Sequence, residues 1–217
     1  MHLIHVLSLS LLCLSVSLTY VAGTVRENPE YEWSYPELEM ANEKFQDAWQ
    51  FCQKNISLHL VYRTYTKDYL FDAGVRCLRI NATFINRKEK TLGVMFEYWD
   101  SYRAYRLSGP GYLHFARTKG YNVTNVLDSR LALSTVTKGT PFVLAFTDYR
   151  TCALVRFPNA NGGCQVWNFA DSLDSADNNP CHFVADIFCG KEKHYVHDKD
   201  LCAEVAYKPF LTSRDEL

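Results

Sequence analysis

The sequence predicts an all-β fold: an eight-stranded, antiparallel, up-and-down barrel with helices flanking it. Eight short segments rich in β-branched and aromatic residues follow one another along the chain. Clusters of turn-forming residues separate several of these segments. No long helix lies between them, which argues against a parallel sheet with crossover helices. A β-sandwich is the alternative that the same pattern allows.

The N-terminus carries an apolar segment, residues 4–21, that is interrupted by short polar residues and followed by Ala22-Gly23. Small residues here suit signal peptidase, so we expect residues 1–23 to be a signal peptide. A membrane anchor is the alternative, but the apolar run is short. No later run reaches the length of a spanning helix, so we expect a secreted protein without a membrane partner.

Residues 24–35 are acidic and aromatic and are predicted to form a tail. Ser34 is expected to cap a helix that has Pro36 in its first turn. In that helix apolar residues recur at i, i+3, i+4 and i+7, which indicates one buried face. These residues are Leu38, Ala41, Phe45, Ala48, Trp49 and Cys52.

After Asn55 the apolar period changes to two, which is typical of strands. The expected strands span residues 58–65, 77–86, 91–100, 112–117, 125–137, 141–148, 152–157 and 164–169. The expected turns span residues 86–90, 109–111, 138–140 and 158–163. Closure of these strands into a barrel would remove the sheet edges and leave room for one small ligand.

The last part of the chain has weaker signatures. Residues 176–189 look helical but contain Pro180, and residues 198–202 begin a short tail. We therefore expect one domain over residues 36–206 and a C-terminal tail over residues 207–217. The final tetrapeptide, residues 214–217, is close to the K-D-E-L retrieval signal, so retention in the endoplasmic reticulum is the alternative to secretion.

The cysteines also indicate an oxidising compartment. Of the 8 cysteines, Cys13 would be removed with the signal peptide. The remaining odd number predicts three disulfides and one thiol, either free or paired between chains. Zinc binding is the alternative, but no C-x2-C pair occurs. Three N-x-S/T sequons, at Asn55, Asn81 and Asn122, predict glycosylated surface positions.

Composition and motifs limit the functional classes. The formal net charge is −1, so no global field would steer the protein to nucleic acid. The 14 Tyr and 13 Phe suit a core or a cavity with apolar walls and polar tips. No G-x-S-x-G, P-loop or H-E-x-x-H motif occurs, so we expect neither catalysis nor a cofactor. His194 and His197 have a spacing that could share a metal, but an exposed polar face without metal is expected there.

The cysteine and tryptophan framework resembles that of the tick salivary lipocalins, a group that includes the histamine-binding proteins. The resemblance covers about residues 36–206. It is carried by Asp47-Ala48-Trp49, Cys77, Asp148-Tyr149-Arg150-Thr151-Cys152-Ala153-Leu154, Gly163-Cys164-Gln165-Val166-Trp167, Pro180-Cys181, Cys189-Gly190 and Cys202.

The resemblance implies a lipocalin barrel with an N-terminal and a C-terminal helix packed outside it. It also implies the disulfides Cys77–Cys202 and Cys152–Cys181, and, by similarity to six-cysteine relatives, Cys164–Cys189. Cys52 is then the odd thiol. A buried, inert thiol is expected there, with an intermolecular bridge as the alternative.

The resemblance also implies a ligand site. Family members that bind biogenic amines carry an Asp directly after the Cys152 position and a Glu two residues before the Trp167 position. This chain has Ala153 and Gln165 instead, and neither offers a formal charge to offset an ammonium group.

Two other positions keep the family pattern, and a third carries a different aromatic residue. Asp68, three residues after Tyr65, matches an acid that contacts the amine, although a solvated loop residue would look the same. Phe71 lies where the family often has Trp, and Trp167 itself is kept. The expected ligand-binding residues are Tyr65, Asp68, Phe71, Gln165 and Trp167, with ordinary core packing as the alternative for the aromatic ones.

The expected function is therefore sequestration of a small host mediator by a secreted, monomeric binding protein, which would blunt host inflammation. The ligand is expected to be a biogenic amine such as histamine, or an eicosanoid or fatty acid. The alternative is a barrel that serves only as a scaffold, with a host protein bound through the acidic, aromatic tail around Tyr31, Trp33 and Tyr35.

Overall fold

The computed structural model describes residues 30–53, 56–66, 74–131, 139–173 and 179–210. The expected signal peptide and the C-terminal tetrapeptide lie outside these ranges, as do Asn55, Asp68 and Phe71. No helix within the described ranges is both long and apolar enough to cross a membrane.

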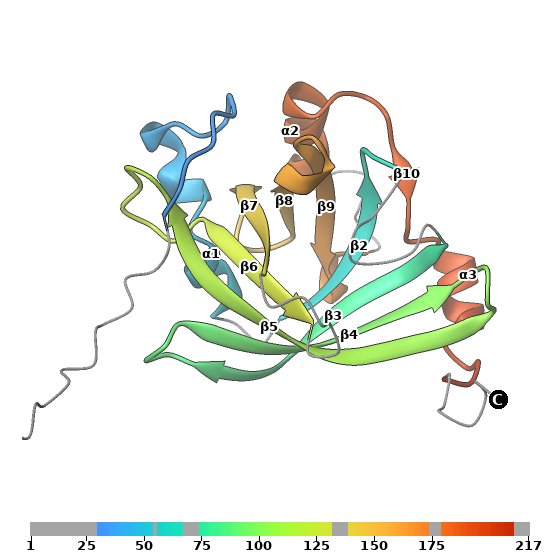
Figure 1. Cartoon of the computed structure of the whole chain (residues 1–217). Helices are drawn as coiled ribbons and strands as arrows, with labels where there is room; N and C mark the ends of the chain where they lie inside the picture. The colour runs from blue at the N-terminus through green and yellow to red at the C-terminus, as the bar shows by residue number, and fades with distance from the viewer. Residues whose placement is uncertain (1–29, 54–55, 67–73, 132–138, 174–178, 211–217) are drawn as a thin grey trace, which may run out of the picture.

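Eight antiparallel strands form a closed barrel, as predicted (Figure 1). In sheet order β5, β4, β3, β2, β9, β8, β7 and β6 are neighbours, and a further pairing of β5 with β6 closes the circle. This closure excludes the β-sandwich. The strands are β2 Ser57–Arg63, β3 Val75–Asn86, β4 Thr91–Asp100, β5 Tyr105–Thr118, β6 Val126–Leu131, β7 Thr140–Thr147, β8 Cys152–Phe157 and β9 Gly163–Phe169.

The turn predicted at residues 109–111 is wrong, because these residues lie inside β5. Gly109 is opposite Phe96 on β4, and a Cβ at Gly109 would come within 2.6 Å of the Phe96 ring. The glycine therefore makes room for a side chain of the neighbouring strand. Within the described residues, the pairing of β5 with β6 extends only to Gly111, so Pro110 needs no hydrogen bond to β6 there.

The N-terminal helix is shorter than predicted and does not begin at Ser34. A 3-10 turn, η1 Met40–Phe45, is followed by α1 Ala48–Cys52. The helix breaks at Gln46, whose side-chain amide donates to the carbonyls of Glu37 (2.9 Å) and Ala145 (2.7 Å). Asp47 then starts a new helix by accepting a hydrogen bond from the backbone N–H of Gln50.

The described ends of the predicted tails are packed against the barrel. β1 Glu30–Tyr31 pairs in parallel with the end of β5, and the rings of Tyr31 and Trp33 stack 4.6 Å apart. At the other terminus Phe210 forms an isolated bridge with Arg106. Backbone pairing thus holds parts of both predicted tail segments against the barrel.

Two helices follow the barrel. α2 Pro180–Phe188 packs outside β7, β8 and β9. Pro180 begins this helix instead of interrupting it, and Asn179 caps it. The strand β10 His194–Tyr195 pairs with β2, and α3 Lys199–Val205 replaces the tail that was predicted to begin at Asp198.

Three disulfides attach these helices to the barrel, with the pairing that the family resemblance implies. The bridges are Cys77–Cys202, Cys152–Cys181 and Cys164–Cys189. Cys52 is free and buried. Each bridge therefore joins a barrel strand to the segment after β9.

Two histidines face each other between β2 and the segment that leads to α3. The ring of His197 lies edge-on to that of His59, with centroids 5.6 Å apart. Burial, His197 and Arg79 together lower the pKa of His59 to about 4. Burial also lowers the pKa of His197, against the opposing charge of Asp198.

We expect this pair to make the fold sensitive to acid. An unfolded histidine titrates near 6.5, so its stabilising effect is full above that pH and is lost as pH falls toward 4. The melting temperature should therefore fall across this window, and less steeply in His59→Gln. His194→Gln, which removes a histidine from the segment that carries His197, is the control. If the melting temperature falls equally with pH in His59→Gln and in the unchanged protein, the expectation is contradicted.

Candidate ligand-binding site

The barrel holds a cavity of about 80 Å³, to which every barrel strand contributes at least one side chain. Its walls are almost entirely apolar, from Leu58 on β2 round to Val155 on β8. The volume is about half that of the roughly 150 Å³ apolar cavity known to admit benzene. Even a ligand with a single ring would therefore require side chains of the wall to move.

The helix α1 closes one end of the cavity. Phe51 and Cys52 from this helix, and Ile56 just after the gap in the described chain, all line it. Phe51 and Cys52 therefore point inward from a helix that lies at the end of the barrel. Burial strongly raises the pKa of the Cys52 thiol, so Cys52 acts here as an apolar wall residue.

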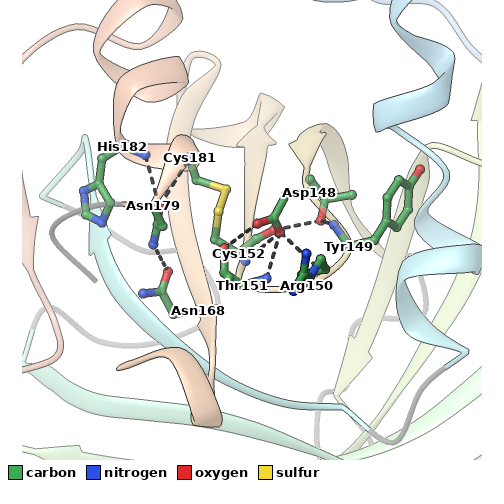
Figure 2. The surroundings of a disulfide bond; sticks show 10 residues. Asp148, Tyr149, Arg150, Thr151, Cys152, Asn168, Asn179, Cys181 and His182 are labelled. Carbon is green, nitrogen blue, oxygen red and sulfur yellow. Dashed lines mark hydrogen bonds between the residues drawn. A yellow bond between two sulfur atoms is a disulfide. The ribbon is translucent and has the colours of Figure 1, made fainter. Parts of the chain in front are cut away.

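The family motif around Cys152 builds the turn beside this closed end (Figure 2). Asp148 Oδ1 accepts the backbone N–H groups of Arg150 (2.9 Å), Thr151 (2.8 Å) and Cys152 (3.1 Å). Burial raises the pKa of Asp148, but the hydrogen bonds from Thr151, Arg150 and Cys152 outweigh it and hold the pKa below its usual value. The Asp148 carboxylate therefore shapes the turn.

Two segments of the family motif meet at this turn. Tyr149 has a positive φ of 58°, and its hydroxyl accepts the backbone N–H of Asp47 at 3.0 Å. In Figure 2 the Cys152–Cys181 disulfide lies beside Asn179, which caps α2 and donates to Asn168 at 2.8 Å. The motif thus joins α1, the β7–β8 turn and α2, which is a structural role.

The polar end of the cavity lies away from α1. Trp167 Nε1 donates to Gln165 Oε1 at 2.9 Å, and Gln165 Nε2 donates to the Tyr65 hydroxyl. Gln165 and Trp167 line the cavity and are 3% and 8% exposed. The structure therefore brings together three of the five predicted ligand-binding residues, and the other two, Asp68 and Phe71, lie outside the described ranges.

Aromatic rings surround this polar end. Tyr65 lies 5.7 Å from the ring of Phe157, which stacks on Phe142 at 4.7 Å. A Cβ at Gly163 would come within 2.6 Å of the Tyr65 ring, so the glycine allows Tyr65 to lie close to the start of β9. Sequence reasoning missed Phe142, which the alternation of its strand could have placed on the inner face.

The charge of the cavity wall differs from that of an amine site. Ala153 is fully buried and lies opposite Trp167, so the position where amine-binding relatives carry Asp does face the cavity. The described wall has no carboxylate and no base; its polar side chains are Ser129, Gln165 and the indole of Trp167. Such a wall can hold an apolar molecule with one hydrogen-bonding group but does not offset a buried cation.

The remaining predicted positions lie outside this cavity. His194 bonds Glu192 at 2.8 Å, whereas His197 packs on His59. No group of three or more potential metal ligands was found among the described residues. The sequon residue Asn122 is exposed, and Asn81 is half-buried on β3, where it accepts a hydrogen bond from Ser57.

Comparison with known proteins agrees with this architecture. Residues 36–204 match the family model of the tick histamine-binding protein. No curated protein matches the chain.

Solved structures with the same fold share little sequence with the chain. The protein AM182, in complex with serotonin, has a TM-score of 0.52 at 13% identity over 70% of this chain and 90% of its own. Japanin from Rhipicephalus appendiculatus, bound to cholesterol, has a TM-score of 0.51 at 11% identity over 68% and 95%. Apocrustacyanin C2 has a TM-score of 0.50 at 13% identity over 82% and 94%.

Proposed function

This chain belongs to the tick histamine-binding protein family, and we propose that it is a secreted protein that sequesters a small, mostly apolar host mediator inside its barrel. One observation carries the choice of ligand: the described cavity wall has one glutamine and no carboxylate. A lipid-like mediator such as an eicosanoid or fatty-acid derivative suits such a wall better than a biogenic amine. Removal of that mediator would blunt inflammation in the host.

Three further features support a binding role. The barrel is not filled by its own side chains, as a pure scaffold would be, because a cavity remains at its centre. One structural neighbour is described in complex with serotonin and another is bound to cholesterol. Three disulfides suit a protein that works outside the cell.

Fluorescence titration of the secreted protein with amines, eicosanoids and steroids tests the proposal. We expect saturable binding of an apolar member of the panel, with weaker binding of histamine, and loss of the fluorescence change in Trp167→Phe. Absence of saturable binding across the panel would exclude the proposal. Submicromolar histamine binding that Asp68→Asn weakens would instead establish the amine site.

Filling the cavity should abolish ligand binding. Ala153 lies against Trp167 in the wall, so the ring in Ala153→Phe would occupy most of the free space. We expect binding to weaken by at least about a hundredfold, since overpacking and lost ligand contacts act together. Ala203→Phe, at an exposed position on α3, is the control, and calorimetry measures both. Unchanged affinity in Ala153→Phe would place the ligand elsewhere.

A further inference from the structure

A second pocket, which we call the α3 pocket, lies between α3 and the outer face of the barrel and measures about 110 Å³. Its charged walls are Arg79 on β3, Glu97 on β4 and Arg106 on β5. Arg79 and Glu97 alternate with residues that line the barrel cavity, so they lie on the opposite face of the sheet. In Figure 1 α3 stands beside the ends of these three strands.

A β-bulge in β3 contains Cys77, the cysteine whose disulfide attaches α3 to the barrel. Arg76 pairs with Trp99 and Arg79 pairs with Glu97, so two residues of β3 lie opposite one residue of β4. Cys77, one of the two, adopts a positive φ of 55° and forms the disulfide to Cys202 on α3. The pocket is therefore a fixed feature of the fold, and all its lining residues belong to the described chain.

The charges of the α3 pocket do not balance. Arg79 Nη2 and Arg106 Nη2 donate to the same oxygen, Glu97 Oε2, at 2.6 and 3.1 Å. Two guanidinium groups thus share one carboxylate, which leaves a formal charge of one positive unit. α3 contributes Cys202 and Val205 to the lining, and Ala206 follows directly after the helix, so this segment adds no acidic side chain to the wall.

The side chains of Arg79 and Arg106 differ in how many contacts they make with other groups. Arg106 also donates to the Ala206 carbonyl at 2.7 Å and lies 3.9 Å from the ring centroid of Phe210, so it contacts the segment that follows α3. The Arg79 side chain is 40% exposed and, within the residues that the structure describes, its only hydrogen bond is the one to Glu97. The excess charge and the remaining N–H donors therefore belong to Arg79.

We propose that the α3 pocket binds a small oxyanion, a carboxylate, phosphate or sulfate group, through the guanidinium of Arg79. A planar guanidinium fork matches the oxygens of such groups. Trp99 and Tyr98 also line the pocket, and aromatic rings of this kind can attract a cation. The excess positive charge decides against a cation and in favour of an anion.

His59 gives this site a readout of its own. It lines the α3 pocket, and its pKa is lowered to about 4 by burial, by His197 and by the positive charge of Arg79. An anion bound at Arg79 offsets that charge. Anion binding should therefore raise the pKa of His59 while leaving ligand binding inside the barrel unchanged.

Histidine NMR of the whole secreted protein tests the proposal, with sulfate, inorganic phosphate or acetate replacing chloride at constant ionic strength. We expect a saturable shift of the His59 ring signals and a rise in its pKa. Arg79→Gln should weaken binding at least about tenfold, whereas Glu97→Gln should strengthen it by removing the opposing charge. Arg117→Gln, at a half-exposed ion pair elsewhere on the barrel, should change nothing.

The three anions distinguish a carboxylate site from a phosphate or sulfate site. Absence of a saturable His59 shift with all three would overturn the proposal, and so would equal affinity in Arg79→Gln and the unchanged protein. Melting curves of Arg79→Gln and Glu97→Gln show whether each variant is folded. If Glu97→Gln is unfolded, the affinity of Arg79→Gln for the anions alone tests the proposal.

Discussion

We expect the Arg156→Ala variant to lose about 3–5 kcal/mol of its free energy of unfolding, because the change leaves a buried carboxylate without its partner. Arg156 forms a two-point ion pair with Glu37, and the two side chains are 8% and 3% exposed. Arg156 also donates to the carbonyls of Gly162 (2.6 Å) and Phe188 (3.1 Å). One guanidinium thus joins the N-terminal segment, β8, the β8–β9 turn and the end of α2.

Urea unfolding compares this variant with Arg117→Ala. Arg117 and Glu30 form an ion pair whose side chains are 44% and 49% exposed, so its loss should cost no more than about 1 kcal/mol. In the double variant Glu37→Gln/Arg156→Ala the cost should be smaller than the sum of the single costs, since no buried charge remains. A loss in Arg156→Ala no greater than in Arg117→Ala would show that Glu37–Arg156 does not hold this face together.

The barrel could be predicted because strands are local and their apolar residues alternate. Two elements show where local reasoning stops. The predicted N-terminal helix breaks at Gln46, whose amide finds a carbonyl 99 residues away on β7. The Gly109–Gly111 stretch looks like a turn but lies inside β5, where Gly109 makes room for Phe96 of the neighbouring strand β4. Both outcomes depend on contacts between distant segments, which outweigh local preferences.

The candidate site was predicted only in part, for a similar reason. Gln165 and Trp167 could be identified because they belong to the cysteine framework, and their shared strand parity places both on the inner face. The α3 pocket requires the register of β3 against β4, and the bulge at Cys77 shifts that register. A sequence shows Arg79 and Glu97 as two separate surface charges until the register pairs them.

Removal of the Cys77–Cys202 bridge should cost more than removal of either other disulfide. It closes a loop of 125 residues, against 29 and 25 for the other two. In the chain-entropy model these loops correspond to about 5 kcal/mol for the longest and about 3.5 kcal/mol for each of the others. Urea unfolding of variants in which both cysteines of one bridge are changed to Ser tests this order of free-energy losses. A larger loss on removing Cys164–Cys189 than on removing Cys77–Cys202 would contradict it.

The Cys77–Cys202 bridge should also matter for only one of the two proposed sites, the α3 pocket. α3 has seven residues and buries only Val205, so without the disulfide little apolar contact holds it on the barrel. The variant Cys77→Ser/Cys202→Ser should therefore lose the His59 response to anions, because the α3 pocket loses a wall. The barrel cavity is lined by other residues, so ligand binding reported by Trp167 should remain while the protein is folded. Loss of both responses in the folded variant would mean that the cavity depends on α3.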